Sequence, residues 1–253
     1  IWGLGETEEG AFRSFLATEL GVNDTEVLSW DMMCHDLTPS SPLGRNEEFY
    51  AAPRIDNLAS CHAALEALRD IESVASNTIS AVVLFDHEEI GSESSTGARG
   101  PMLSHALERI AGTRAVSREQ FLRSLSRSAC ISADGAHAVH PNYVDRHEPE
   151  HQVVLNGGPV IKLNANVRYA TDAESSAVAQ SACRSAGVPF QQYAHRSNLP
   201  CGSTIGPITA SQLGMLVADI GSPQLSMHSA REMAGASDPA YLTAALKAFL
   251  SDG

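Results

Sequence analysis

The chain has 253 residues, of which 43% are hydrophobic and 19% are charged, a composition typical of a globular protein with a substantial core. Its 17 lysines and arginines against 30 aspartates and glutamates give a net charge of −13, which argues against the basic face that nucleic-acid binding requires. No stretch approaches the roughly 18 consecutive apolar residues of a membrane span. The sequence therefore excludes a transmembrane protein and disfavours a nucleic-acid partner.

The cysteines and the first residues bear on the cellular setting. The 5 cysteines are an odd number and include no C-x-x-C pair, so we expect reduced thiols and a cytoplasmic location. The opening residues, IWGLGETEEG, carry neither the basic nor the apolar segment of a secretory signal. Because the chain begins with Ile rather than Met, we expect it to be a piece of a longer protein.

The N-terminal third predicts two helices and one strand. Residues 8–20 have the pattern of a helix, and residues 25–32 that of a strand. Residues 37–53 contain three prolines and several turn residues, so we expect an ordered loop. A helix over 57–70 follows from apolar residues at helical spacing, with Asp56 in the position of its N-cap.

Two apolar segments lead directly into acidic residues. Residues 78–85, TISAVVLF, predict a buried strand, and residues 129–133 predict a second strand that ends at Asp134. In open α/β sheets, ligands bind at the carboxyl ends of the strands. The other expected elements are helices over 101–111, 117–127, 172–186 and 238–250, strands over 152–155, 159–163, 189–194 and 215–219, and a glycine-rich turn at 202–206. This alternation predicts an α/β fold with a mixed central sheet flanked by helices.

Potential metal ligands stand beside turns or at strand ends in four short strings: RIDN at 54–57, DHEEIGS at 86–92, SADGAH at 132–137 and SMHS at 226–229. Each string has an ordinary explanation on its own. Asp56 fits a helix N-cap, adjacent glutamates are usually solvated, Asp134 fits a turn cap, and a lone histidine such as His228 is more often structural than a ligand.

Together the four strings favour a metal site. Acids at the ends of apolar strands lose part of their hydration, and buried carboxylates are costly unless they are paired or bind a cation. A divalent ion removes that cost. Because adjacent side chains diverge, one of Glu88 and Glu89 can bind the metal while the other acts as a general base about one water away.

These strings also carry a resemblance to a known family. From about residue 34 to 250 the chain resembles the aspartyl aminopeptidases, family M18 of the zinc metallopeptidases, in six ordered segments: PRIDNLASCHAALEAL (53–68), FDHEEIGSESSTGA (85–98), SADGAHAVHPNY (132–143), GPVIKLNANVRYAT (158–171), PCGSTIGPI (200–208) and DIGSPQLSMHSARE (219–232). The resemblance implies the phosphorylase/hydrolase-like catalytic domain of zinc aminopeptidases. It implies hydrolysis of N-terminal Asp or Glu from peptides by two zinc ions, with Co²⁺ or Mn²⁺ as substitutes. It also implies a homo-oligomer, a dodecamer in the complete enzyme.

The resemblance assigns roles to individual residues. Asp56 would bridge the two metal ions, and Glu88 would be the general base. The implied metal ligands are Asp56, Glu89, Asp134 and His228, and the residues implied around the substrate are His137, Lys162 and Tyr169. Lys162 is the leading candidate for binding the acidic side chain of the substrate, with Arg168 and Arg196 as alternatives.

Two features depart from the family pattern. The first metal of the family takes a histidine from an H-x-D string, which this sequence lacks, because His35 is followed directly by Asp36. Asp56 and Asp134 alone would give that metal two protein ligands, and zinc rarely has so few. The intervening dimerisation domain is also missing. We therefore expect residues 1–33 to be the tail of that domain and residues 34–253 to be an incomplete catalytic domain.

Three other interpretations fit the same residues. One is an aminopeptidase of broader specificity. Another is a catalytically silent fragment or pseudoenzyme that binds one metal or none and serves in assembly, which the missing H-x-D string favours. The third is a metal-free α/β binding module. For the isolated chain we expect at most one tightly held zinc ion and little turnover, because a lost ligand removes transition-state stabilisation.

Overall fold

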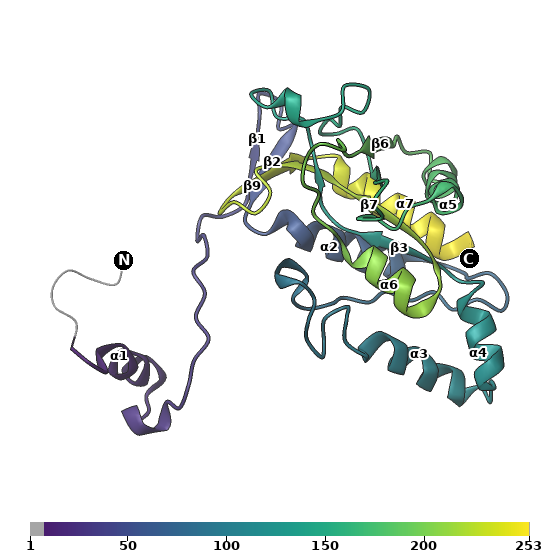
Figure 1. Cartoon of the computed structure of the whole chain (residues 1–253). Coiled ribbons are helices and arrows are strands. Elements are labelled where there is room, and N and C mark those ends of the chain that lie inside the picture. The colour runs from purple at the N-terminus through teal and green to yellow at the C-terminus, as the bar shows by residue number, and fades with distance from the viewer. Residues whose placement is uncertain (1–7, 253) are drawn as a thin grey trace. The chain divides into compact units, whose positions relative to one another are not determined.

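The computed structural model describes residues 8–252, which form two compact units that divide after Asp36 (Figure 1). In the first unit, α1 (Ala11–Leu20) ends at Gly21, whose φ of 67° is a conformation that glycine adopts without strain. The helix predicted here is confirmed. The strand predicted over 25–32 is wrong, because its first residues belong to the short helix η1 (Asp24–Glu26) and the rest form no strand. That this unit is the tail of a dimerisation domain stays a prediction.

The second unit contains a four-stranded sheet of mixed direction. Its strand order is β3-β7-β5-β6, with bounds Ala129–Ala133, Leu216–Gly221, Val160–Leu163 and Gln191–Ala194. The pairs β3–β7 and β5–β6 are parallel, and β5 pairs with β7 in the antiparallel direction. All four strands agree with strands predicted from the sequence, and the predicted α/β class with a mixed sheet is confirmed.

A second sheet of five short strands was not predicted. Its order is β1-β2-β9-β8-β4, with bounds Ser41–Leu43, Phe49–Ala52, Glu232–Gly235, Pro223–Leu225 and Ala136–His137. Two of these strands lie inside the segment that we expected to be a loop, residues 37–53. Strands of two to four residues carry too short an alternation to be recognised in a sequence, and two of the pairings, β2 with β9 and β4 with β8, join distant parts of the chain.

Helices cover both faces of the four-stranded sheet. On one face lie α2 (Ile55–Asp70), α5 (Ala173–Ser185) and α7 (Asp238–Asp252), whose apolar side chains form the main core with β5 and β7 (Figure 1). Successive side chains of a strand point to opposite faces. In β7, Ala218 and Ile220 enter this core, whereas Asp219 points to the other face, where its Oδ1 accepts a hydrogen bond of 2.6 Å from Thr204 at the start of α6 (Ile205–Leu213). The remaining helices are α3 (Met102–Thr113) and α4 (Arg118–Leu125).

Three further segments differ from their predicted structure. Residues 78–85 form no strand, because within the described residues no neighbouring strand pairs with them. Residues 152–155 form no strand either. The side-chain amide of Gln191 accepts a hydrogen bond from the N–H of Val154 at 2.8 Å and donates one to its carbonyl at 2.9 Å, so these two groups bond to a side chain in place of a neighbouring strand. The turn expected at 202–206 contains the first residues of α6, which Thr204 caps through the N–H of Gly206.

The end of β3 and the link from β7 to β8 bring the two sheets together. The N–H of Asp134 donates to the carbonyl of Ile220 at 2.9 Å, so the chain after β3 continues beside the end of β7. A Cβ atom at Gly221 would lie 1.6 Å from the carbonyl oxygen of Asp134. Only glycine permits this approach, which places Asp134 beside the end of β7 and lets the chain continue into β4, a strand of the second sheet.

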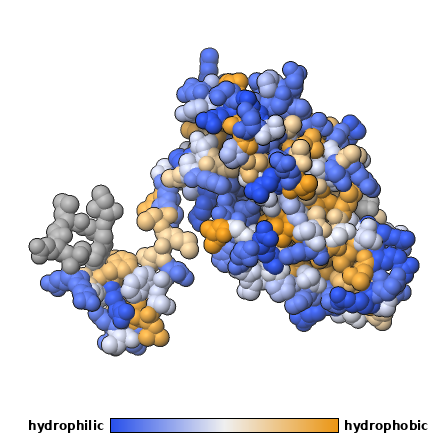
Figure 2. Space-filling model, in the orientation of Figure 1, coloured by the Kyte–Doolittle hydropathy of each residue, from blue (hydrophilic) through white to orange (hydrophobic). Residues whose placement is uncertain are grey.

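The face of the molecule that Figure 2 shows is predominantly polar. Hydrophilic side chains cover most of the visible face, and apolar side chains occur in separate patches (Figure 2). Among residues 8–252, no helix combines the length and the apolar character that crossing a membrane requires.

The packing of α7 against the sheet gives a test of the core. Leu242 is completely buried in the main cluster, and Leu242→Ala should lower the free energy of unfolding by about 2–5 kcal/mol, measured by urea denaturation. The matched control is Leu65→Ala, the same change at a position of α2 that is 49% exposed, which should cost less than about 1 kcal/mol. Equal losses for the two variants would contradict this core.

Candidate metal centre

Side chains from three separate parts of the chain converge near the first residues of α2. A ligand atom from each of Asp56, Glu89 and His228 lies within 4.8 Å of the other two. The Nε2 atom of His228 is 3.0 Å from Oδ2 of Asp56 and 2.8 Å from Oε2 of Glu89. Glu89 belongs to the short helix η2 (Glu88–Ile90), and His228 to the turn between β8 and β9. We call these three residues the ligand cluster.

The backbone at the start of α2 directs Asp56 into the ligand cluster. Asp56 was predicted to cap this helix, and that prediction is wrong, because Arg54 has the N-cap position. The dihedral angles of Asp56 (φ −79°, ψ 110°) are not helical. Its Oδ1 atom is buried and has no hydrogen-bond partner in the structure. Burial, and then the charges of Asp134 and Glu89, raise the pKa of Asp56 to about 8.

Asp134 lies at the edge of the ligand cluster and is shared with a buried lysine. Its carboxyl contacts that of Asp56, and its Oδ2 is 3.2 Å from Nζ of Lys162. The Lys162 ammonium also donates to the carbonyl of Gly135 at 3.0 Å and lies 5.1 Å from the centre of the Tyr169 ring. The structure thus brings together Asp134, Lys162 and Tyr169, and it pairs the charge of Asp134 with a cation of the protein itself.

Glu88 combines a position beside the ligand cluster with a perturbed acidity. Burial is the main cause, and the charges of Asp134 and Glu89 add to it, so that the pKa of Glu88 rises to about 7. A carboxylate with a pKa near neutral pH both accepts and returns a proton, which is what general acid–base catalysis requires. Among the described acids around the ligand cluster, Glu88 has the chemistry of a proton carrier.

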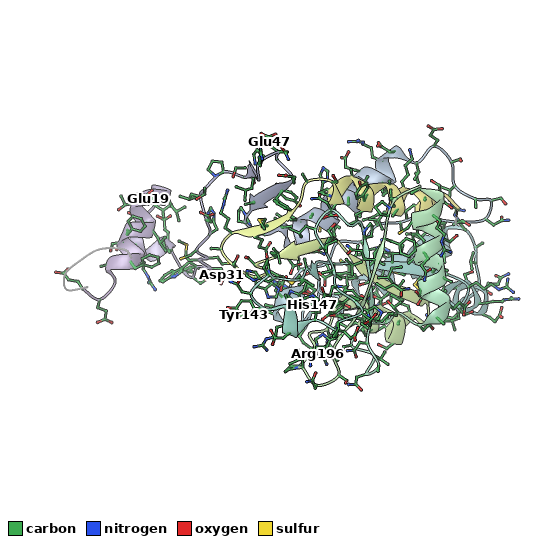
Figure 3. All side chains as sticks on the ribbon, turned by 90° about the horizontal axis from the view of Figure 1, so that it is seen from above. Glu19, Asp31, Glu47, Tyr143, His147 and Arg196 are labelled. Atoms are coloured by element: carbon green, nitrogen blue, oxygen red, sulfur yellow. The ribbon has the colours of Figure 1, made fainter. Side chains whose placement is uncertain are left out.

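The pKa of His137 is lowered although the residue is exposed overall. The main cause is desolvation of the ring, followed by the charges of Lys162, His147 and His228, against a smaller opposite effect of Asp134. His147 is buried, and its Nε2 lies 3.2 Å from the backbone oxygen of His137. Figure 3 labels Tyr143, His147 and Arg196. Arg196 donates a hydrogen bond to the backbone carbonyl of Asp145, in the loop that carries Tyr143 and His147. Arg196 is therefore bound to this loop.

One buried acid that the sequence did not single out touches two members of the ligand cluster through their backbone. Glu232, 2% exposed, accepts the N–H of Asp56 on Oε2 at 2.8 Å and the N–H of His228 on Oε1 at 2.7 Å. The available signal was an acid at the beginning of a strand, four residues after His228. This signal identifies a residue of the site only in the folded protein, where the two sheets bring Glu232 next to the backbones of Asp56 and His228.

The donor set fits a zinc ion. Two carboxylates and an imidazole are ligands that zinc prefers, and their atoms are close enough to share one ion. The unpartnered buried oxygen of Asp56 and the like charges around it are what a divalent cation would satisfy. A Cβ atom at Gly135 would lie 3.2 Å from Oδ1 of Asp56, so a glycine also keeps space open there.

The fold and the ligand cluster describe a mixed α/β protein with a candidate carboxylate–histidine metal centre. The chain belongs to the M18 family, because residues 5–250 match the family model described as "Aminopeptidase I zinc metalloprotease (M18)". It is 50% identical over 257 residues to "Probable M18 family aminopeptidase 2" of Mycobacterium tuberculosis, covering 99% of this chain and 59% of that protein.

Solved structures agree with this family. The chain matches a structure of the Ape4 and Nbr1 complex with 36% identity and a TM-score of 0.86, covering 98% of this chain and 50% of that one. It matches the mApe1 dodecamer of S. cerevisiae with 30% identity and a TM-score of 0.81, covering 94% and 54%. The chain therefore spans between half and three fifths of the length of these relatives.

Zinc should stabilise this chain through the ligand cluster. At free zinc about 100-fold above Kd, binding to the native state adds about 2.7 kcal/mol and raises Tm by about 5–10 °C for a chain of this size. His228→Ala should remove most of that rise, as measured by thermal unfolding with and without zinc. His62→Ala, at an exposed position of α2, is the control and should keep it. A rise that survives in His228→Ala would place the ion elsewhere.

Proposed function

We propose that the protein containing this chain is a zinc aminopeptidase that removes N-terminal residues, preferably Asp or Glu, from peptides. The observation that carries the proposal is the ligand cluster of Asp56, Glu89 and His228, and it is supported by Glu88, the chain neighbour of Glu89, whose pKa is raised to about 7. Membership of the M18 family supports the same reaction. Because the chain spans 59% of its Mycobacterium tuberculosis relative, the activity is proposed for the whole protein.

Each residue around the ligand cluster has a part in this mechanism. Asp56, Glu89 and His228 would hold zinc, which when bound polarises the scissile carbonyl and makes a water more acidic. Glu88 would accept the proton of the attacking water and return it to the nitrogen of the leaving amine. Neutral His137 would donate a hydrogen bond to the oxygen of the tetrahedral intermediate.

We propose further that the site of the whole protein holds two metal ions. The two oxygens of Asp56 face different neighbours: Oδ2 is 3.0 Å from His228, whereas Oδ1 faces the position of Gly135 beside Asp134. A bridging role for Asp56 between a cluster ion and a second ion at Asp134 fits this arrangement. The second ion would need ligands beyond Asp56 and Asp134, because zinc sites take about four. Cobalt or manganese could replace zinc at such sites.

The acidic preference rests on Lys162. It is 2% exposed, and a buried ammonium attracts a carboxylate strongly because little water screens the interaction. Tyr169, over whose ring it lies, would form a wall of the same subsite. Arg168, which donates to the carbonyl of Cys201, is exposed, and Arg196 is only partly buried, so solvent screens their charges more than that of Lys162.

Assembly and location complete the proposal. The S. cerevisiae relative is described as a dodecamer, and we propose a homo-oligomer of the same kind for the whole protein, with residues 1–33 as part of its dimerisation domain. We also propose a cytoplasmic location, which the odd number of cysteines and the lack of a C-x-x-C pair support.

A second candidate function is a silent chain that serves in assembly. The charge of Asp134 is already paired with Lys162, and the sequence lacks the H-x-D string that would complete the first metal site. A chain of this kind would bind one zinc ion and hydrolyse nothing. The activity of the full-length protein separates it from the first proposal.

Removing the proton carrier should separate catalysis from metal binding. In the full-length protein, Glu88→Gln should lower kcat by about 10²–10⁴-fold and leave the zinc content unchanged, since it removes a proton acceptor but no ligand. Release of N-terminal Asp and zinc analysis are measured on the same sample. Glu93→Gln, an exposed position beyond η2, is the control. A Glu88→Gln enzyme with more than about a tenth of the normal kcat would exclude this role.

The acidic preference should depend on one cation. Lys162→Met should lower kcat/KM for an Asp substrate relative to a Leu substrate by about 10²-fold, because it removes the charge that pairs with the substrate carboxylate. Arg196→Met in parallel should leave the ratio unchanged. If Arg196→Met changes the ratio and Lys162→Met does not, the acidic side chain of the substrate binds at Arg196 rather than at Lys162.

A further inference from the structure

We infer that Glu232 is a positioning residue, which sets the metal affinity of the ligand cluster by holding the backbones of Asp56 and His228 in place at the same time. The inference rests on the proposed zinc centre and adds a residue to it. Glu232 would not bind the ion. It would act through two ligands that are 172 residues apart in the sequence but meet at one carboxylate.

The hydrogen bonds of Glu232 are complementary to its two partners. Each carboxylate oxygen accepts one backbone N–H, Oε2 that of Asp56 at 2.8 Å and Oε1 that of His228 at 2.7 Å. Two N–H donors need two acceptors, and an ionised carboxylate offers only acceptors. An amide of the same shape has one acceptor and one donor, so a glutamine would place an N–H group against an N–H group.

Both partners have backbone conformations that regular structure does not impose. Asp56 leaves the helical region at ψ 110°, although it lies within the bounds of α2. His228 has a φ of 63°, in the left-handed region that is unfavourable for residues with a side chain. Such conformations persist where surrounding contacts enforce them. The bonds to Glu232 fix the two N–H groups, and through them the directions in which the carboxylate and the imidazole leave the backbone.

Glu232 is itself held by the sheet. In the ladder between β2 and β9 it pairs with Ala52, two residues before Arg54 at the start of α2. Its neighbour Arg231 extends toward residues 38–41, where it donates to the carbonyl of Pro39 at 2.9 Å. The carboxylate therefore reaches the ligand cluster from a rigid strand. Fixed partners behind metal ligands commonly change metal affinity by about 10–100-fold when they are removed.

Asp238 provides a matched comparison. It is also a buried carboxylate, 1% exposed, and it also accepts two backbone N–H groups, from Asn156 at 2.7 Å and Gly158 at 3.0 Å. Neither donor belongs to the ligand cluster. Asp238→Asn therefore reproduces the chemical change of Glu232→Gln at a site that supports the fold alone.

The experiment measures zinc affinity and folding separately in this chain. Zinc Kd is obtained by competition with a chelator, and Tm is measured for the metal-free protein. Glu232→Gln should weaken zinc binding by about 10–100-fold, whereas Asp238→Asn should lower the metal-free Tm and keep the normal Kd. With Co²⁺ in place of zinc, Glu232→Gln should alter the visible absorption bands, which report the arrangement of the ligands, and Asp238→Asn should not.

The outcomes separate this inference from the proposed metal centre. A Glu232→Gln chain with normal Kd and cobalt spectrum overturns the positioning role, and so does a loss of affinity that Asp238→Asn reproduces. If the unmodified chain binds no zinc, the proposed metal centre itself fails, and the inference with it. Should Glu232→Gln not fold, Glu232→Asp carries the same test: it keeps the charge but withdraws both oxygens by about 1.5 Å, the length of one C–C bond, and should weaken zinc binding in the same way.

Discussion

The crowding of carboxylates around Asp56 is the constraint on which the rest of the site depends. Like charges in a partly buried space repel, and each must be compensated or lose its charge. The chain compensates its acids differently: Asp134 pairs with the Lys162 ammonium, and Glu232 accepts two backbone N–H groups. In the described part of the chain, the side chain that pairs with both Asp56 and Glu89 is the imidazole of His228, and one oxygen of Asp56 has no hydrogen-bond partner. The uncompensated charge is thus concentrated where a cation would bind.

This concentration exists because two sheets meet. The four-stranded sheet supplies Asp134 at the end of β3 and Lys162 from β5, while the five-stranded sheet supplies Glu232 at the start of β9 and the turn that carries His228. Asp56 belongs to the first turn of helix α2. No single sheet or helix presents more than part of the site, so its geometry depends on the junction beside Gly221 rather than on any local motif. A defect in that junction would disturb every ligand together.

The sequence was informative where structure is determined locally. The helices α2 and α7 and the strands β3 and β7 follow from periodicity over their own residues, and the ligand strings follow from residue type beside strand ends. Prediction from the sequence failed where the structure of a segment depends on a partner far along the chain. Residues 78–85 have the composition of a strand but no neighbour that pairs with them, and β9 is too short to recognise without its ladder to β2. The sequence offered both a helix-cap role and a metal-ligand role for Asp56 and could not decide between them, because Glu232, which accepts the N–H of Asp56, lies far along the chain.

Different parts of the second unit supply its stability and its chemistry. The face of the four-stranded sheet that packs on α2, α5 and α7 is apolar, with Ile161 and Leu242 fully buried, and it supplies the favourable free energy of burial. The ligand cluster and its surroundings carry groups whose burial is unfavourable, which is why the acidities of Asp56, in α2, and Glu88, in η2, shift toward neutral pH. A protein selected only for stability would replace such acids. Their convergence at one point, beside a sheet anchored in the core, is consistent with a site whose arrangement is fixed before any ligand arrives, and electrostatic catalysis requires that fixed arrangement.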